Sequence, residues 1–478
     1  MAQPAKLLRK PNLLVFLPDE QRADTIACYG GAKVHAPNLN KLASQSFVFQ
    51  QAYVTHPLCT PSRSSLMTGT WPHSNGCTHN DIRLDTHFRC LPELIGDNDY
   101  YYAYMGKWHL GDEVFTQHGF EDWVSIEDSY RAFSAGRDPN AMSHYNKFLV
   151  SKGLKPDNKK KRGVFTNRFS TRLPFELSKS KFLETSACEF LGRHRREPFV
   201  LFVAFHEPHP PYNGPFNSEH SLKQISLDPT VDHVFSENMP LRYRLRQEYE
   251  QSGRSRDDYL KTKQKYLGLV TEIDQCIGAI LLKLQELGLA DNTIVVHTSD
   301  HGDMMSAHGL FGKEVLFQEA VRVPYLVRLP NQRRLGSVSQ PVSHIDFAPT
   351  IIDLLGKPPH EQCVGKSRAP LIRGETMPAE TVFLQWAPNN RLEMKKGSTL
   401  AKPDEIQRAL NESTRAAISS DGWKLCLRDA DKNELYNLRS DPGELQNLYD
   451  RADHKDLITR LTNEIHHWQE AVGDTLKV

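Results

Sequence analysis

The sequence predicts an α/β protein, with a mostly parallel central sheet flanked by helices, then a smaller antiparallel sheet and a terminal helix. Two observations carry this prediction. Short apolar runs alternate with helical stretches along most of the chain, and several runs are followed directly by charged or metal-binding residue types. Continuous apolar runs are typical of parallel strands buried on both faces. In such sheets ligands bind beyond the carboxyl ends of the strands, so we expect the functional residues there.

The elements follow from the pattern in chain order. Buried parallel strands are expected at residues 13–17, 101–105, 199–205, 293–297 and 324–329. The clearest helix covers residues 259–287 and is capped by Gly288. Antiparallel strands are expected at 381–386, 415–419, 423–428 and 434–437, and a last helix at 455–472. We therefore expect a catalytic domain at 1–370 and a C-terminal α+β subdomain at 371–478.

Within the first domain, residues 113–197 are rich in polar and basic residues and are expected to be a variable insertion. Its basic run at 159–162 is expected to be a solvated loop. The alternative is that this run steers an anionic substrate toward the cleft.

Bulk composition excludes several classes of protein. With 39% apolar and 24% charged residues and a net charge of +1, the chain has no global field that would recruit nucleic acid or a membrane. No apolar stretch is long enough to span a bilayer. Eight scattered cysteines without a CxxC pair predict neither a zinc knuckle nor a disulfide framework. Residues 1–10 lack the apolar core of a signal peptide, which predicts a cytoplasmic protein, although a chain trimmed of its leader would look the same.

Residues 59–69 are the most informative segment. Cys59 precedes Pro61 and Arg63 at the start of an expected helix. A cysteine at a helix N-terminus beside an arginine is an activated thiol or part of an anion site. The alternative is a capped helix with an ordinary small apolar cysteine.

Two strand ends carry residue types that bind metals. Asp19 and Glu20 follow the first strand, and Asp300 and His301 follow the fourth. Carboxylate oxygens suit Ca²⁺, Mg²⁺ or Mn²⁺, and an imidazole shifts the preference toward Mn²⁺ or Zn²⁺. Loop polar groups or helix caps are the alternative for either pair.

The pattern Cys-x-Pro-Ser-Arg, followed by six residues that end in Thr-Gly, resembles the signature of the formylglycine-dependent type I sulfatases of the alkaline-phosphatase-like superfamily. The resemblance implies that a maturation enzyme oxidises Cys59 to formylglycine, whose hydrate is the nucleophile, and that Arg63 orients this hydrate. Residues 11–22 and 298–303 resemble the two metal segments of the family. Glu20 stands where Asp is commoner, and His301 replaces a frequent Asn, as in some sulfatases and the related phosphonate monoester hydrolases. Ca²⁺ is the expected ion, with Mn²⁺ and Mg²⁺ as alternatives.

The same resemblance implies an anion clamp. Residues 105–111 resemble the family segment that supplies Lys107 and His109, residues 207–212 supply His209, and Lys313 matches a lysine that follows the metal pair. Asn80 stands where some relatives contact substrate, although a turn asparagine explains it almost as well. His206 has no assigned role and is expected in the core or at the rim of the site.

The function implied is hydrolysis of a sulfate ester, with a sulfated small molecule or carbohydrate as substrate and the maturation enzyme as partner; an oligomer is possible. The alternative is a phosphonate monoester or phosphodiester hydrolase that uses the same site. Two other classes are an unmatured sulfoglycan-binding protein and a cysteine hydrolase, and the second lacks an evident His-Asn partner set.

Overall fold

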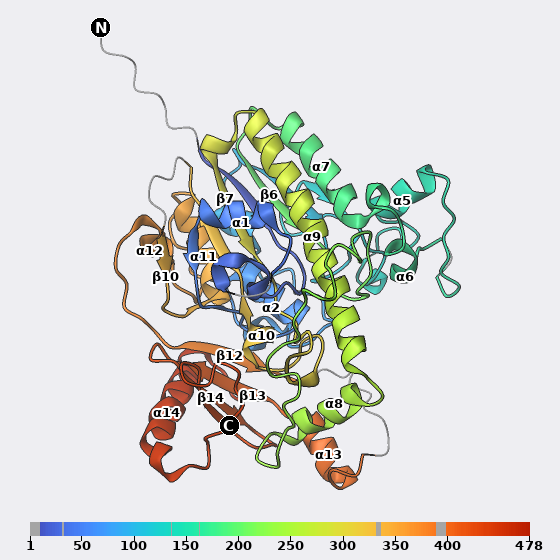
Figure 1. Cartoon of the computed structure of the whole chain (residues 1–478). Coiled ribbons are helices and arrows are strands. Elements are labelled where there is room, and N and C mark those ends of the chain that lie inside the picture. Colours follow the sequence, from blue (N-terminus) through green and yellow to red (C-terminus); the bar gives the residue numbers. More distant parts are fainter. Residues whose placement is uncertain (1–9, 31–32, 135, 162, 331–335, 389–397) are drawn as a thin grey trace.

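A central sheet of eight strands organises the described part of the chain. The computed structural model describes residues 10–478 except 31–32, 135, 162, 331–335 and 389–397 (Figure 1). The strand order is β10-β2-β9-β7-β1-β6-β4-β5. The bounds are β1 (Asn12–Phe16), β2 (Phe47–Phe49), β4 (Tyr101–Gly106), β5 (Asp122–Val124), β6 (Phe199–Ala204), β7 (Thr293–Thr298), β9 (Tyr325–Arg328) and β10 (Gly336–Val338). A small second sheet joins β3 (Ala52–Tyr53), β8 (Arg322–Val323) and β11 (Val342–Ser343).

The strand pairing confirms a mostly parallel sheet and corrects one strand. β7, β1, β6, β4 and β5 are all parallel neighbours. The strand expected at residues 324–329 is β9, and its prediction as parallel is wrong, because it runs antiparallel to β7 and to β2. A parallel strand needs a crossover that returns the chain from the carboxyl ends of the strands to their amino ends. The segment after β7 instead stays at the carboxyl end, where it builds the functional loops, and re-enters the sheet from there.

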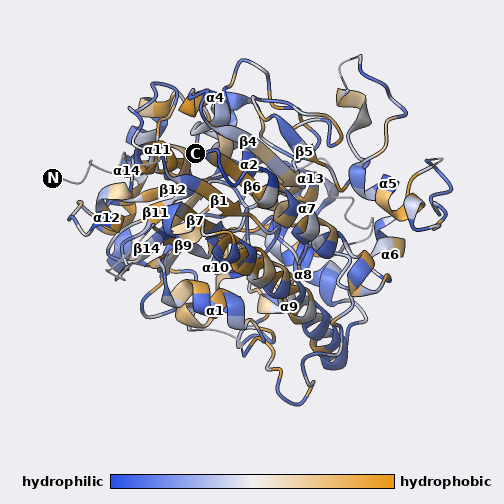
Figure 2. Ribbon diagram, turned by 90° about the horizontal axis from the view of Figure 1, so that it is seen from above, coloured by the Kyte–Doolittle hydropathy of each residue, from blue (hydrophilic) through white to orange (hydrophobic). Residues whose placement is uncertain are grey.

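Helices cover both faces of the sheet, which explains the continuous apolar runs (Figure 2). Leu13 and Val15 of β1 face one hydrophobic core, with α2 (Cys59–Thr68) and α11 (Phe347–Leu354). Leu14 and Phe16 face the other core, with α1 (Pro37–Ser44), α7 (Lys179–Arg193) and α9 (Arg256–Glu286). Apart from the terminal helix, the other α-helices of the described residues are α3 (Pro72–Asn75), α4 (Leu91–Ile95), α5 (His144–Ser151), α6 (Asn167–Ser170), α8 (Leu241–Gln251), α10 (Gln318–Val321), α12 (Ala369–Arg373) and α13 (Pro403–Leu410).

The segment expected as an insertion, 113–197, is built into the domain at both ends. It supplies the edge strand β5, and α7 packs along α9. Between them α5 and α6 project to one side (Figure 1). Of the basic run at 159–162, residues 159–161 are exposed, and residue 162 lies outside the described residues.

The C-terminal part forms the expected antiparallel sheet, of β12 (Val382–Trp386), β13 (Thr414–Ile418), β14 (Trp423–Arg428) and β15 (Glu434–Asn437). The terminal helix α14 (Lys455–Val472) packs on one face through Leu461 and Ile465. Leu384 and Ala416, on the other face, belong to the core of the α/β domain. The C-terminal sheet is therefore docked onto the main body, where the backbone N–H of Gln385 in β12 donates to the carbonyl of Thr55, shortly before α2, at 2.8 Å.

Two expectations concern the chain as a whole. Among the described helices, none combines the length and the apolar character that crossing a bilayer requires. Residues 1–9, on which the expectation of a missing signal peptide mostly rests, lie outside the described residues.

Candidate active site

Four neighbouring parallel strands bring the predicted residues to one edge of the sheet. In parallel strands the carboxyl ends coincide, so the loops that follow them meet. The loops after β7, β1, β6 and β4 deliver Asp300, Asp19, His209 and Lys107 respectively. The backbone N–H of Asp19 donates to the carbonyl of Phe205 at 3.1 Å, and the carbonyl of Ala204 accepts from Lys107 at 2.9 Å. These bonds extend the sheet ladder up to the site.

Cys59 is the first residue of α2, a helix buried along its whole length. Gly69 ends the helix in the left-handed conformation, with φ of +67°. At the other end, the backbone N–H of Thr60 donates to Asn80 Oδ1 at 3.0 Å. The helix thus aims Cys59 at the strand ends. Asn80 satisfies one of the free N–H groups at the helix start, and this contact accounts for its place beside the site.

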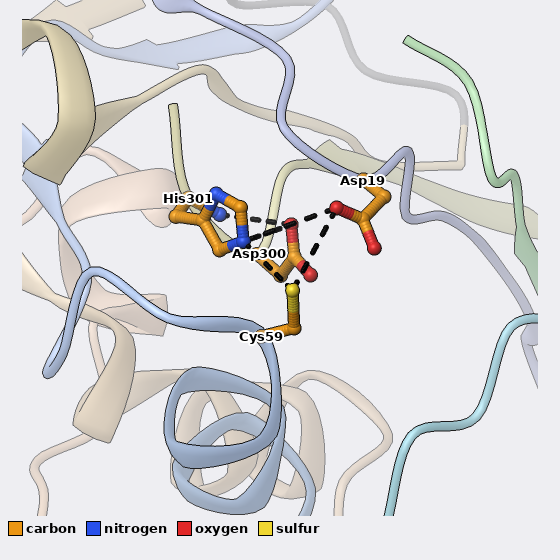
Figure 3. A group of neighbouring side chains, drawn as sticks. All are labelled: Asp19, Cys59, Asp300 and His301. Atoms are coloured by element: carbon orange, nitrogen blue, oxygen red, sulfur yellow. Dashed lines mark hydrogen bonds and ion pairs between the residues drawn. The ribbon is translucent and has the colours of Figure 1, made fainter. Parts of the chain in front are cut away.

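Cys59 lies among acidic and basic side chains (Figure 3). Its Sγ is 3.1 Å from His301 Nε2, 3.9 Å from Lys107 Nζ and 4.0 Å from Asp19 Oδ1. Burial alone would raise the pKa of the thiol, but Lys107 and Lys313, followed by His301, outweigh it and hold the pKa well below its ordinary value. The site therefore stabilises negative charge at this position.

Arg63, one turn further along α2, holds the two aspartates. Its Nε donates to Asp300 Oδ2 at 2.8 Å and its Nη2 to Asp19 Oδ2 at 3.2 Å, while Nη1 donates to the carbonyl of Lys107 at 2.7 Å. All three side chains of the triad are buried. Arg63 therefore orients the two carboxylates that lie beside Cys59.

Three of the four predicted metal ligands converge. Ligand atoms of Asp19, Asp300 and His301 lie within 4.8 Å of one another and of Cys59 Sγ. His301 Nδ1 donates to the carbonyl of Gly302 at 3.0 Å, so that Nε2 faces the cluster. Two carboxylates and one imidazole in a buried cluster are a ligand set that fits a divalent cation.

Glu20 lies to one side of this group. Its Oε2 accepts from Lys313 Nζ at 2.6 Å and lies 3.7 Å from His209 Nε2, while its buried Oε1 has no partner among the described residues. Its backbone is left-handed, with φ of 69°. Burial raises the pKa of this carboxyl well above its ordinary value. The structure groups Glu20 with Asp19 and His209, separately from the cluster of Asp300 and His301.

The cationic residues approach from two sides. Lys107 Nζ lies 2.5 Å from Asp19 Oδ2, and Lys313 is paired with Glu20. His209 is the most accessible of the predicted group, with a quarter of its side chain exposed. Burial, reinforced by the nearby Lys313 and Lys107, lowers the pKa of His209. The internal ion pairs keep both lysines in place for an anionic ligand.

His109 has a partner that the sequence did not indicate. Its Nε2 is hydrogen-bonded to the hydroxyl of Tyr130, and its buried Nδ1 has no hydrogen-bond partner among the described residues. Tyr130 belongs to the segment expected as an insertion, where no motif marks it. The carboxylate of Glu113 accepts the backbone N–H groups of Trp108 and His109 at 2.9 and 2.8 Å, and so fixes the His109 loop, in which φ of His109 is 63°.

His206 is part of a buried ion-pair group beside the site. Its Nε2 lies 3.3 Å from Glu127 Oε1, which also pairs with Lys179 at 3.3 Å. Burial, followed by the charge of Lys179, lowers the pKa of His206 well below its ordinary value. These contacts give His206 a structural role in the protein wall beside the site.

Comparison with known proteins agrees with this geometry. The family model described as sulfatase matches residues 11–357. The chain is 24% identical to N-acetylglucosamine-6-O-sulfatase of Bacteroides thetaiotaomicron, over 93% of this chain and 84% of the relative. The structure is similar to that of phosphonate monoester hydrolase from Silicibacter pomeroyi, with a TM-score of 0.79, 21% identity, and coverage of 97% of this chain and 96% of that chain.

A further solved structure, of a protein in complex with its substrate D-glucosamine-2-N,6-O-disulfate, has a TM-score of 0.74 at 20% identity and covers 98% of this chain and 99% of that one. These likenesses establish an alkaline-phosphatase-like fold, and the family model spans most of the chain, including every predicted site residue. The chain therefore belongs to the sulfatase family and is, by that membership, a sulfuric ester hydrolase.

Proposed function

We propose that this protein hydrolyses the sulfate ester of a sugar or another small alcohol through a formylglycine made from Cys59. The observation that carries the proposal is the position of Cys59 Sγ, within 4.8 Å of the ligand atoms of two buried aspartates and His301. The names of the relatives support a sulfated carbohydrate as substrate, since they include an N-acetylglucosamine-6-O-sulfatase.

Asp19, Asp300 and His301 would hold the divalent cation. Hard oxygen ligands favour Ca²⁺, with Mn²⁺ and Mg²⁺ as alternatives, and when bound the ion supplies positive charge beside the nucleophile. Arg63 keeps both aspartates oriented for this task.

The proposed reaction begins with the maturation of Cys59. The maturation enzyme removes two electrons from Cys59 with molecular oxygen as the oxidant; the sulfur leaves as sulfide, an aldehyde oxygen takes its place, and water adds to form a geminal diol. One hydroxyl, whose proton passes to Asp300, forms a bond to the ester sulfur while the bond between sulfur and the alcohol oxygen breaks. The second hydroxyl then gives its proton to the histidine that protonated the alcohol, the aldehyde re-forms, and sulfate leaves. A sulfated cysteine or serine has no second hydroxyl, so it could not complete this last step.

The remaining residues handle charge and protons. Lys107 and Lys313 are placed to offset the negative charge on the sulfuryl oxygens. The departing alcohol oxygen takes a proton from a histidine, either His209 or His109. His209 is the more exposed of the two and faces Glu20, whereas His109 is held by Tyr130.

Phosphonate monoester or phosphodiester hydrolysis is the second candidate. The specific observation in its favour is His301 in the cluster, together with the structural likeness to a phosphonate monoester hydrolase. The attack on phosphorus would use the same residues.

The test begins with the mass of the tryptic peptide that contains Cys59, from protein co-expressed with a formylglycine-generating enzyme. We expect the mass of the aldehyde form. An unmodified thiol would contradict the proposal when the same maturation enzyme converts the cysteine of a control substrate. The matured protein is then assayed on aryl sulfates and aryl phosphonate esters. We expect sulfate esters to be preferred by orders of magnitude in kcat/KM, and the reverse ratio would favour the second candidate.

A further inference from the structure

A cleft of about 670 Å³ lies between the α/β domain and the C-terminal subdomain. The α/β domain contributes Gln318 and Glu319 of α10, Arg322 of β8, and Gln340. The C-terminal subdomain contributes Ser420 and Arg439. Neither Cys59 nor any of the predicted clamp residues lines it, so it is a separate feature of the fold.

The lining contains buried polar atoms that lack partners. Among the described residues, no hydrogen bond reaches Arg322 Nε, Gln318 Nε2, Gln340 Nε2 or Glu319 Oε2, and all four residues line this cleft. Buried polar groups are normally paired, and an unpaired one is costly. Three of these four atoms are N–H donors. A ligand that satisfies them must therefore present acceptor oxygens.

The charges point the same way. The guanidinium of Arg22 at the cleft wall is already neutralised by Asp24 and Asp228, at 2.7 and 3.1 Å. Arg322 forms no ion pair with a carboxylate in the described part of the chain, and Arg439 donates to the carbonyl of Ser420 at 3.1 Å. Two arginines thus remain available for an anion.

The carboxyl of Glu319 does not repel an anion in the cleft at neutral pH. Burial, together with the nearby Asp228, raises the pKa of its carboxyl to about 8. A protonated carboxyl also offers a donor, so all four of these unpaired atoms are matched to acceptors.

We propose that this cleft is a noncatalytic binding site for an oxyanion, a sulfate or carboxylate group that is carried by a sugar or is free in solution. The planar fork of an arginine matches such groups, and amide N–H groups add neutral donors. The volume lies in the range of pockets for small organic ligands, which favours an oxyanion carried by a sugar. The proposed function enters only through the choice of a sulfated sugar as probe.

The test uses the full chain with Cys59→Ala, so that no probe is consumed. N-acetylglucosamine 6-sulfate, N-acetylglucosamine and sodium sulfate are titrated by calorimetry. Arg322→Gln removes a positive charge from the cleft. Gln318→Glu adds a negative charge, which repels an anionic ligand, without changing the shape of the cleft. Arg256→Gln is the matched control, because Arg256 is exposed and pairs with Asp232 elsewhere. Thermal unfolding checks that each variant is folded.

We expect each cleft variant to weaken binding of the sulfated sugar at least about tenfold. The same binding should persist in Lys313→Ala, which changes the site around Cys59 and leaves the cleft intact. Equal affinity for sodium sulfate would identify free sulfate as the ligand, and a preference for the sulfated sugar would identify the sugar-borne group. Unchanged affinity in both cleft variants, equal binding of the unsulfated sugar, or loss of all binding in Lys313→Ala would overturn the proposal. Hydrolysis by the matured wild-type protein is assayed separately, so a failure of the proposed function is distinguishable from a failure of this site.

Discussion

The cluster around Cys59 and the subdomain cleft are both polar, but they satisfy their polar groups in opposite ways. Around Cys59 nearly every charge is paired internally: Arg63 with two aspartates, Lys107 with Asp19, and Lys313 with Glu20. In the cleft, donors of Arg322 and Gln318 have no partner among the described residues.

The difference indicates two kinds of preorganisation. Paired charges hold their positions before a ligand arrives, so the cluster is suited to chemistry that depends on exact placement. Unpaired donors gain most from a ligand that simply supplies acceptors, so the cleft is suited to binding.

Replacing Cys59 with Ser should abolish turnover, lowering kcat by at least about 10³-fold, because the formylglycine hydrate cannot form. The buried helix should stay folded, since the side chains are nearly isosteric. Hydrolysis of an aryl sulfate and the thermal unfolding midpoint are measured together. Cys28→Ser, at a half-buried position away from the site, is the control and should remain active. A fully active Cys59→Ser protein would refute the mechanism.

Metal binding should stabilise the cluster and depend on its aspartates. Ca²⁺ added to chelator-treated protein at about 100 times its Kd should stabilise the folded state by about 2.7 kcal/mol, seen as a higher thermal midpoint. Asp300→Ala should remove this rise. Glu20→Gln should keep most of it, because Glu20 lies outside the cluster of Asp300 and His301. Loss of the rise in Glu20→Gln would show that Glu20 moves in as a ligand.

Tyr130→Phe should lower kcat by about tenfold with little change in KM, because His109 loses the hydroxyl that holds its Nε2. We also expect a shifted pH profile of kcat, which a purely structural role would not produce. Tyr145→Phe is the matched control, since within the described part of the chain the hydroxyl of Tyr145 bonds only to the carbonyl of Leu177. Equal kcat in wild type and Tyr130→Phe would remove Tyr130 from the mechanism.

Glu319→Gln should leave turnover unchanged and alter only the pH dependence of stability. The pKa of Glu319 is raised to about 8 in the folded protein, chiefly by burial, from its ordinary value of 4.5. Between these values the folded state keeps a proton that the unfolded state has released, so the free energy of unfolding falls with rising pH, by about 1.4 kcal/mol per unit at most. The variant should lack this contribution, and urea unfolding at pH 5 and pH 8 measures it. Parallel pH dependences in the two proteins would contradict the raised pKa.

The fold was largely predictable because its signals are local. Apolar runs marked β1, β4, β6 and β7, and Gly288 ends the helix that precedes β7, at φ of +67°. The direction of β9 was not predictable, since an apolar run has the same pattern in parallel and antiparallel strands. Only the path of the loop after β7 decides it.

The local pattern alone predicts which residue types stand at the strand ends, and therefore that Asp19 and Asp300 meet. This follows because parallel strands align their carboxyl ends whatever the loops between them do. Long-range packing brought Cys59, at the start of α2, to these two aspartates and set the partners of the site residues. It turned Glu20 toward Lys313, gave Arg63 the two aspartates, used Asn80 to cap α2, and brought Tyr130 onto His109. Such contacts join segments that are distant along the chain, and packing between those segments, which no local pattern records, sets their geometry.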